Sequence, residues 1–347
     1  MATADYYSSA DLKGVAFKGL IREDVMNQIW NISNIPLPLT DRISSDTCEN
    51  SYAEWTTDKL AAPDLANAAV DGADVSTYSG TGNGARVGNQ CQISTKAVAV
   101  TQRAQRSDVI GQSNALAYQI MERQKELRRD VEAIMLTQQA SVADDGDTVP
   151  GKLGGLGAWL TTNDFRGAGG SAAGFANGVV AAPVVGTTRA LSETLIRDCA
   201  QSIYEQGGNP TLLMSIPSMI RKLSEYMFTS SARIATLMSD TGQSREAQVA
   251  KGSVNVFVTD FGVTLEMISN RIMQPVDATP SSENCNVYLI DPSYLRQSFL
   301  EGYNVQPLAK TGLADKREMS VDYTLKVLNE AAHGVIADID YKLAVVA

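Results

Sequence analysis

Histidine is nearly absent from this chain of 347 residues, which contains a single one, His333. We therefore expect neither a histidine-dependent catalytic triad nor a metal site with several histidines within one chain. His333 stands between Ala332 and Gly334, near a turn between two expected strands. A structural role is favoured over catalysis, because a catalytic histidine needs partners. The sequence predicts no catalytic residue, no metal ligand and no cofactor.

Cysteine is scarce, and Cys48, Cys91, Cys199 and Cys285 form no C-x-x-C pair. Neither a disulfide framework nor a zinc site is indicated, and we expect buried thiols in a reducing compartment. The chain lacks an apolar run that could span a bilayer, and its first residues, MATADYYSSADLKG, show no basic leader or apolar block. These absences predict a protein with no membrane partner that is made in cytoplasm.

Positive charge is also limited, since the formal net charge is -10. Such an acidic chain is not expected to wrap nucleic acid tightly through its phosphates, although a local contact stays open.

Two glycine-rich stretches match nucleotide-binding motifs only in part. Gly146–Lys152 has most of a P-loop, but Leu153 stands where a Ser or Thr must bind magnesium, and a helix is expected before it instead of a strand. Gly80–Ala85 imitates a dinucleotide fingerprint without a following helix, and we interpret it as a flexible tip. A nucleotide-dependent enzyme using Lys152 therefore remains only as a remote alternative.

The strongest pattern present is an amphipathic helix from about Arg106 to Val142. Its apolar stripe consists of Val109, Leu116, Ile120, Leu127, Val131 and Ile134. Charged residues around the stripe, Glu132 among them, are expected to face mostly water or a partner. At about 1.5 Å per residue the helix would be about 55 Å long, which suggests a beam across an extended subunit. The alternative is the central helix of an ordinary α+β domain.

Apolar segments that a single chain cannot easily cover precede this helix. Ile35–Leu39 is expected to be extended, because its two alternating prolines exclude a helix, and it predicts an arm that lies across another surface. Between Ser51 and Thr101 we expect two strands around a tip rich in Gly, Asn and Asp, with Cys91–Ala97 as the returning strand. A two-stranded extension is marginal alone, which points to a neighbouring subunit as its support.

After the helix, the glycines of GKLGGLGAWLTTN suggest a chain that bends closely around packed elements. A helical stripe over Leu191–Ile203, a buried strand at Thr211–Ile216 and a helix from Pro217 to about Met227 follow. Further expected elements are a hairpin at Val254–Met267, and strands at Asn286–Ile290, Met319–Val327 and Val335–Tyr341. In Met319–Val327 the odd-numbered residues share the apolar face.

Several short motifs, taken in order, resemble the major capsid proteins of tailed bacteriophages, which have the Hong Kong ninety-seven type of shell fold. The motifs are Gly154-Gly155-Leu156 with Trp159, Thr259-Asp260-Phe261-Gly262, Asn270-Arg271-Ile272-Met273, Leu289-Ile290-Asp291-Pro292, Leu308-Ala309-Lys310-Thr311-Gly312, and Thr324-Leu325 through His333-Gly334. The chain departs from the expected pattern at Leu313-Ala314, where an acidic residue was expected directly after Gly312.

The resemblance implies an α+β fold with an N-terminal arm, an extended β-hairpin loop, a long spine helix, a peripheral domain and an axial domain. The implied segments are 1–45 for the arm, 46–101 for the extended loop, 102–187 for the spine helix and peripheral-domain connector, 188–315 for the axial domain with peripheral-domain strands, and 316–347 for the C-terminal peripheral-domain strands. Inter-subunit contacts are expected at Trp30, Trp55, Tyr78, Arg86, Arg128 and Arg129.

The function implied is that of a major capsid protein, without catalytic activity. It would form pentamers and hexamers of an icosahedral shell around a double-stranded DNA phage genome, assembled in the host cytoplasm and retained in the virion. Implied partners are further copies of the chain, portal, scaffolding and decoration proteins, and packaged DNA bound without sequence specificity. A cellular nanocompartment shell of the same fold is the alternative.

Overall fold

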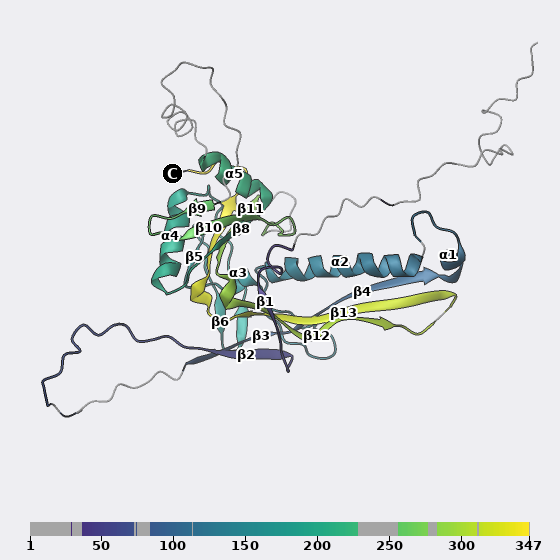
Figure 1. The fold of residues 1–347 in the computed structure, drawn as a ribbon, viewed down its shortest axis with the longest axis horizontal. Coiled ribbons are helices and arrows are strands. Elements are labelled where there is room, and N and C mark those ends of the chain that lie inside the picture. The colour runs from purple at the N-terminus through teal and green to yellow at the C-terminus, as the bar shows by residue number, and fades with distance from the viewer. Residues whose placement is uncertain are drawn as a thin grey trace, which may run out of the picture.

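The computed structural model describes residues 29, 37–72, 74, 84–112, 114–227, 256–276, 283–310 and 312–346. Two main sheets, one of six strands and one of four, organise these residues (Figure 1). The long helix α2 (Ala115–Met135) begins beside the far end of the four-stranded sheet and ends against the six-stranded body. Two small sheets of two strands each complete the α+β architecture.

The four-stranded sheet follows the order β1-β12-β13-β4 and carries α2 on one face (Figure 1). Its strands are β1 (Ser44–Thr47), β12 (Leu295–Pro307), β13 (Ala314–Val327) and β4 (Gln92–Thr101). The predicted alternation in β13 is confirmed, because Met319, Val321, Tyr323, Leu325 and Val327 are all buried. An ion pair of 2.7 Å between Lys96 of β4 and Asp130 of α2 also joins helix and sheet.

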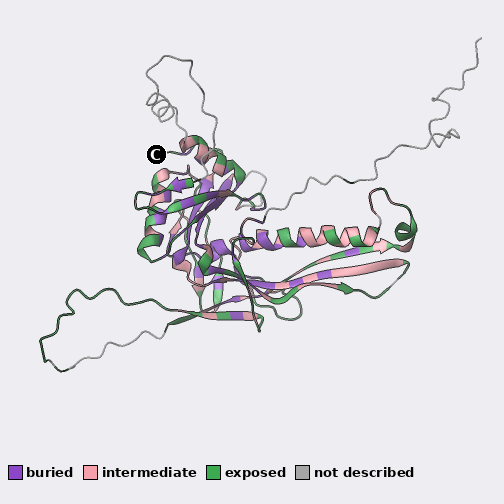
Figure 2. Cartoon of the chain, in the orientation of Figure 1, coloured by how far each residue is buried: buried purple, intermediate pink, exposed green. Residues whose placement is uncertain are grey.

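The six-stranded sheet follows the order β5-β14-β11-β8-β10-β9 and forms the compact end of the molecule. Its strands are β5 (Asp164–Phe165), β14 (Gly334–Asp340), β11 (Asn284–Ile290), β8 (Leu212–Ser215), β10 (Thr264–Ser269) and β9 (Val256–Val258). Helices α4 (Glu193–Glu205) and α5 (Pro217–Met227) pack beside it, and every residue of β8 and β11 is buried (Figure 2). The predicted strands, hairpin and helices of this region are confirmed where the chain is described, while Val254 and Asn255 of the hairpin lie outside the described residues.

The long helix is shorter than the sequence pattern predicts. A separate helix, α1 (Gln102–Arg106), ends at Ser107, and the chain then turns through Gly111, which has φ +72°. Asn114 begins α2 by accepting a hydrogen bond from the Ala117 amide at 3.1 Å. With 21 residues, α2 is about 32 Å long. The expected continuous helix over 106–142 was therefore wrong at both ends, and Val109 lies outside it.

The two-stranded extension exists, but its second strand differs from the prediction. β2 (Tyr52–Thr57) pairs antiparallel with β3 (Ala85–Gln90), although most of β3 lies in the stretch expected to form the tip, Asp71–Asn89. The expected returning strand, Cys91–Ala97, instead enters β4 and pairs with β13. Gly88 is no turn residue: a Cβ there would lie 2.6 Å from the Tyr52 ring, so the glycine makes room for that ring.

The glycine-rich stretch before Trp159 does bend closely around its neighbours, as the sequence predicts. A Cβ on Gly154 would lie 2.7 Å from Val180 of β7 (Val179–Ala181), which pairs with β6 (Gly174–Ala176). A Cβ on Gly155 would overlap the carbonyl oxygen of Thr137, just beyond the end of α2. The short helix α3 (Leu156–Trp159) follows and is entirely buried.

We expect Gly155→Ala to lower the free energy of unfolding by about 3 kcal/mol, because backbone must move to admit the methyl group. Chemical denaturation of the folded subunit measures this. Gly302→Ala is the control, since a Cβ there meets nothing within 4 Å, and its effect should stay within about 0.5 kcal/mol. Equal effects of the two substitutions would contradict the close approach.

Candidate inter-subunit contacts and the junctions behind them

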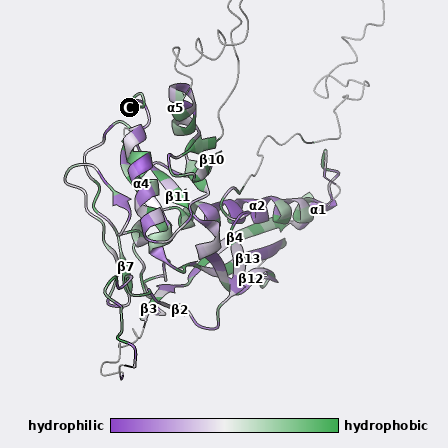
Figure 3. Ribbon diagram, turned by 60° about the vertical axis from the view of Figure 1, so that its left-hand side comes forward, coloured by the Kyte–Doolittle hydropathy of each residue, from purple (hydrophilic) through white to green (hydrophobic). Residues whose placement is uncertain are grey.

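The loop that continues the β2–β3 extension carries apolar side chains that this chain leaves in water. Leu60 is 94% exposed, Leu65 100% and Val70 79%. They lie in residues 58–72, which form no helix or strand and run away from both main sheets (Figures 2 and 3). Apolar side chains as exposed as these gain free energy when another surface covers them.

Trp55 anchors the base of this extension to the body of its own chain. Its indole Nε1 donates a 3.0 Å hydrogen bond to the Val327 carbonyl of β13. Its ring lies 5.4 Å from that of Trp159, which stacks on Phe175 with ring centroids 5.6 Å apart. Trp55 is half-buried by these contacts, so any contact with a neighbouring subunit would be made by the remaining part of its ring.

Arg86 lies on β3 with 70% of its side chain exposed and forms an ion pair with Glu54 of β2. Both line an open pocket of about 570 Å³ between the extension and the β6–β7 hairpin. Of the other contact residues expected in the first part of the chain, Trp30 and Tyr78 lie outside the described residues.

Arg128 and Arg129 are both exposed on α2. The guanidinium of Arg128 lies 5.4 Å from the ring centroid of Tyr303 on β12, a cation–π contact within the chain. The structure therefore places the four expected contact residues that it describes in two regions, the extension and the spine helix, and does not bring these two pairs together. Whether they contact a neighbour stays a prediction.

A buried carboxylate that the sequence analysis assigned to the solvent-facing side joins three parts of the chain. Glu132 of α2 is fully buried. Its oxygens accept hydrogen bonds from the Leu39 amide at 3.2 Å, the Thr40 amide at 3.3 Å, the Thr40 hydroxyl at 3.0 Å and the Asn270 side-chain amide at 2.7 Å. The expectation that Glu132 faces water or a partner was wrong, because its donors come from segments remote in sequence.

The same junction fixes the end of the predicted arm. Leu37 and Leu39 are buried in their own chain, and the guanidinium of Arg42 holds the Glu266 carboxylate through bonds of 2.6 and 2.9 Å. Burial raises the pKa of Glu132, whereas the four hydrogen bonds oppose that effect. The only indication of this buried junction in the sequence is that Glu132 directly follows Val131, a residue of the apolar stripe.

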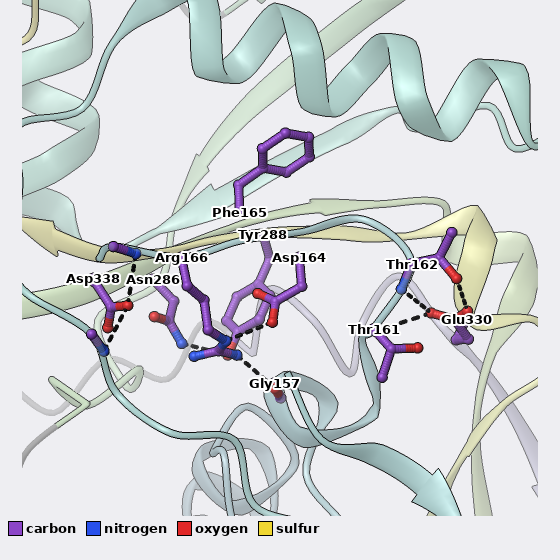
Figure 4. Close-up of polar contacts among 12 residues, drawn as sticks. Gly157, Thr161, Thr162, Asp164, Phe165, Arg166, Asn286, Tyr288, Glu330 and Asp338 are labelled. Atoms are coloured by element: carbon purple, nitrogen blue, oxygen red, sulfur yellow. Dashed lines mark hydrogen bonds and ion pairs between the residues drawn. The ribbon is translucent and has the colours of Figure 1, made fainter. Parts of the chain in front are cut away.

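A second buried polar cluster links β5 to β14 (Figure 4). Arg166 Nε lies 2.6 Å from the Asp164 carboxylate, and both side chains are nearly inaccessible. Asp338 of β14 accepts bonds from the Gly167 and Gly186 amides, each at 3.0 Å. Burial raises the pKa of Asp164 to about 6, while the Arg166 charge opposes this rise. The cluster holds the chain between α3 and α4 against the edge of the six-stranded sheet.

His333 is fully buried, and its Nδ1 accepts a 3.2 Å hydrogen bond from the Asp291 amide. Burial lowers the pKa of His333 to about 4, so the ring is neutral at pH 7 and serves to satisfy a buried amide.

The chain around Gly146–Lys152 forms a hairpin closed by backbone bonds between Val142 and Lys152, which is not the strand–loop–helix setting of a P-loop. Nothing in this geometry supports nucleotide chemistry.

Within the part of the chain that is described, the side chains form no group of three or more His, Cys, Asp and Glu residues suited to a metal ion. In the same residues, no helix combines the length and apolar character needed to cross a membrane.

The architecture of arm end, two-stranded extension, spine helix and two sheets defines the shell fold of the Hong Kong ninety-seven type. A solved structure of Gordonia phage Cozz is similar at a TM-score of 0.55 and 12% identity, covering 100% of this chain and 97% of that one. The capsid asymmetric unit of cyanophage A-1(L) is similar at 0.56 and 12% identity, with coverage of 95% and 99%. The SrpI encapsulin of Synechococcus elongatus PCC 7942 shares the fold at 0.53 and 11% identity, with coverage of 96% and 98%.

These similarities show that the chain has the phage-type shell fold. The family model of the SU10 major capsid protein matches residues 4–340, and the chain belongs to this family. A search among proteins of curated function finds no match. The chain is accordingly a shell-forming major capsid protein of the virion, and its family role is structural.

We expect Glu132→Gln to lower the free energy of unfolding by about 1.5–3 kcal/mol, because an amide NH₂ would replace an acceptor that faces several donors. Urea denaturation measures the change, and faster hydrogen exchange at the Leu39 and Thr40 amides should accompany it. Glu126→Gln is the matched control on the same helix, since it disturbs only a surface ion pair with Arg123. A loss no larger than that of the control would refute the junction.

Asp164 should make the free energy of unfolding of the subunit depend measurably on pH. Its folded pKa of about 6 lies above the ordinary value of 3.8, so its contribution to stability is present below about pH 3.8 and is lost as the pH rises through 6. From pH 4.5 to 7.5 the wild type should therefore lose about 2 kcal/mol of unfolding free energy relative to Asp164→Asn. Parallel denaturation series of the two proteins test this, and a constant difference across the range contradicts it.

Proposed function

We propose that this capsid protein forms pentamers and hexamers of an icosahedral shell that encloses a double-stranded DNA phage genome. The observation that carries the proposal is the exposed apolar surface of Leu60, Leu65 and Val70 on a segment that projects from the body. Covering that surface with a neighbouring copy would remove it from water, and repeated copies of such a contact close a symmetric assembly.

In the proposed shell the six-stranded sheet with α4 and α5 belongs to the axial domain. This assignment includes β14 (Gly334–Asp340), which the resemblance had placed with the peripheral-domain strands of 316–347. The four-stranded sheet and α2 belong to the peripheral domain, and the β2–β3 extension lies over an adjacent subunit. We propose that the exposed faces of Trp55, Arg86, Arg128 and Arg129 join these contacts, together with Trp30 and Tyr78. Many modest contacts then sum through multivalency to a stable shell.

The proposed partners beyond the chain itself are portal, scaffolding and decoration proteins, with assembly in the host cytoplasm. Packaged DNA would be held without sequence specificity. The formal net charge of -10 supports containment of DNA over tight binding, since the chain carries a surplus of groups that phosphate repels.

A nanocompartment shell is the second candidate, favoured by the shared fold of the SrpI encapsulin. The contents of shells purified from a host that carries this gene together with its neighbouring genes distinguish the two candidate functions. Nuclease-protected double-stranded DNA inside the shell supports the phage capsid, whereas a protein cargo without DNA supports the nanocompartment.

The overlap role predicts that Leu60→Ser, Leu65→Ser and Val70→Ser, combined in one variant, will weaken assembly without unfolding the subunit. Each fully buried aliphatic side chain contributes about 1.5–3 kcal/mol to a contact, so the concentration needed for assembly should rise by at least tenfold. Light scattering and electron microscopy follow shell formation. Thermal unfolding of the subunit should not change, because these side chains are exposed in it.

The matched control is Ala61→Ser, Ala62→Ser and Ala69→Ser, which places the same hydroxyl groups in the same exposed segment but removes little apolar surface. Point substitutions are preferable to deleting the outer part of the extension, Asp71–Asn89. That deletion would also remove Asn89, whose buried side chain forms hydrogen bonds with the Gly154 backbone and the Leu325 carbonyl. Wild-type assembly by the apolar-to-Ser variant would refute the proposed overlap.

A further inference from the structure

The fold brings together two cysteines that lie far apart in the sequence. The Sγ atoms of Cys48 and Cys91 are 3.7 Å apart, and both residues are free thiols. Cys199 and Cys285 are also free and are fully buried in the six-stranded end of the molecule. Buried thiols were expected at all four positions, but Cys48 is only partly buried and lies beside Cys91, whereas Cys199 and Cys285 are not part of this pair.

Backbone hydrogen bonds hold both members of the pair in place. The Cys48 amide donates to the Phe299 carbonyl at 3.0 Å, and the Cys91 amide donates to the Ser51 carbonyl at 2.7 Å. A disulfide has an S–S bond of about 2.05 Å, so closure requires a contraction of about 1.7 Å shared between two side chains. That movement is within the range of small side-chain rotations on a fixed backbone.

The position of the pair gives the bond a structural consequence. Cys48 directly follows β1 and Cys91 directly precedes β4, and these are the two edge strands of the four-stranded sheet. The chain between the two cysteines contains β2, β3 and the loop with the exposed apolar residues. A bond here would close a covalent ring at the base of the whole extension.

We propose that Cys48 and Cys91 form an intrachain disulfide when the folded subunit meets a small-molecule disulfide such as oxidised glutathione. Cys48 reacts first, because it is the more exposed of the two and lines an open pocket of about 570 Å³ beside Lys326. Its thiol loses a proton and attacks one glutathione sulfur, which forms a mixed disulfide and releases one glutathione thiolate. Cys91 loses its proton and attacks Cys48 Sγ, which releases the second thiolate. Two protein thiols are oxidised, one glutathione disulfide is reduced, and the two protons pass to the glutathione products.

The surroundings make this reaction slow at neutral pH. Burial raises the pKa of both thiols. The Asp322 carboxylate also raises the pKa of both, and Asp46 raises that of Cys48, whereas the charge of Lys326 lowers the pKa of both thiols. Because the thiolate is the nucleophile, the pair stays reduced in a reducing compartment and closes over longer exposure to an oxidant. The bond would then restrain the base of the extension after the subunit has folded.

The test treats folded soluble subunits with oxidised glutathione at pH 7 and pH 9, followed by alkylation of free thiols and peptide mass spectrometry without reduction. The expected product is a peptide pair joined through Cys48 and Cys91 and lighter by two hydrogen atoms, formed faster at pH 9. Cys199 and Cys285 should remain free thiols during oxidation and should therefore be recovered in alkylated form. In guanidinium the preference for this pair should disappear.

Cys48→Ser and Cys91→Ser, each alone, should abolish the linked peptide. In the wild type, oxidation should also slow proteolysis at the base of the extension, and neither variant should show this protection. Cys48 recovered only as a glutathione adduct, unmodified thiols at both positions, or a dimer on a non-reducing gel would each overturn the proposal. Because the reaction is read on soluble subunits, its failure leaves the proposed shell function untouched.

Discussion

The buried carboxylate of Glu132 is the contact on which the arrangement of this subunit depends. An ionised or partly ionised group inside a protein is stable only when hydrogen bonds replace the water it has lost. Glu132 obtains them from the end of the N-terminal arm and from Asn270 after β10. This junction therefore holds the spine helix both to the arm and to the six-stranded sheet.

The same Asn270 connects this junction to the next turn of the chain. Its side-chain oxygen accepts bonds from the Ile272 amide at 2.8 Å and the Met273 amide at 3.3 Å. Asn89 plays a comparable part on the other sheet, where it joins β3 to β13 and to the turn at Gly154. Buried side-chain amides can donate and accept at once, so each fixes two segments in a defined register.

Local sequence patterns predicted those parts of the fold that depend on periodicity. The alternation in Met319–Val327 identified the buried face of β13, and Pro217 identified the first residue of α5. The helix boundaries failed where a single turn residue decides them, since Gly111 and Asn114 interrupt an otherwise continuous stripe. Glu132, and the approach of Cys48 to Cys91, could not be predicted because both depend on contacts across the folded chain.

Folding and the proposed assembly draw on different residues of the same extension. Its base is fixed by Trp55 and Asn89, whose bonds to β13 exist in the single chain. In the described part of its outer loop, Leu60 and Leu65 are almost fully exposed and therefore add little to the stability of the fold. A firmly held base limits the directions in which the outer loop can point, and this lowers the entropy lost when a neighbour binds it. A subunit built in this way can hold the base of its extension in place before association and still keep apolar surface available for its neighbours in the proposed shell.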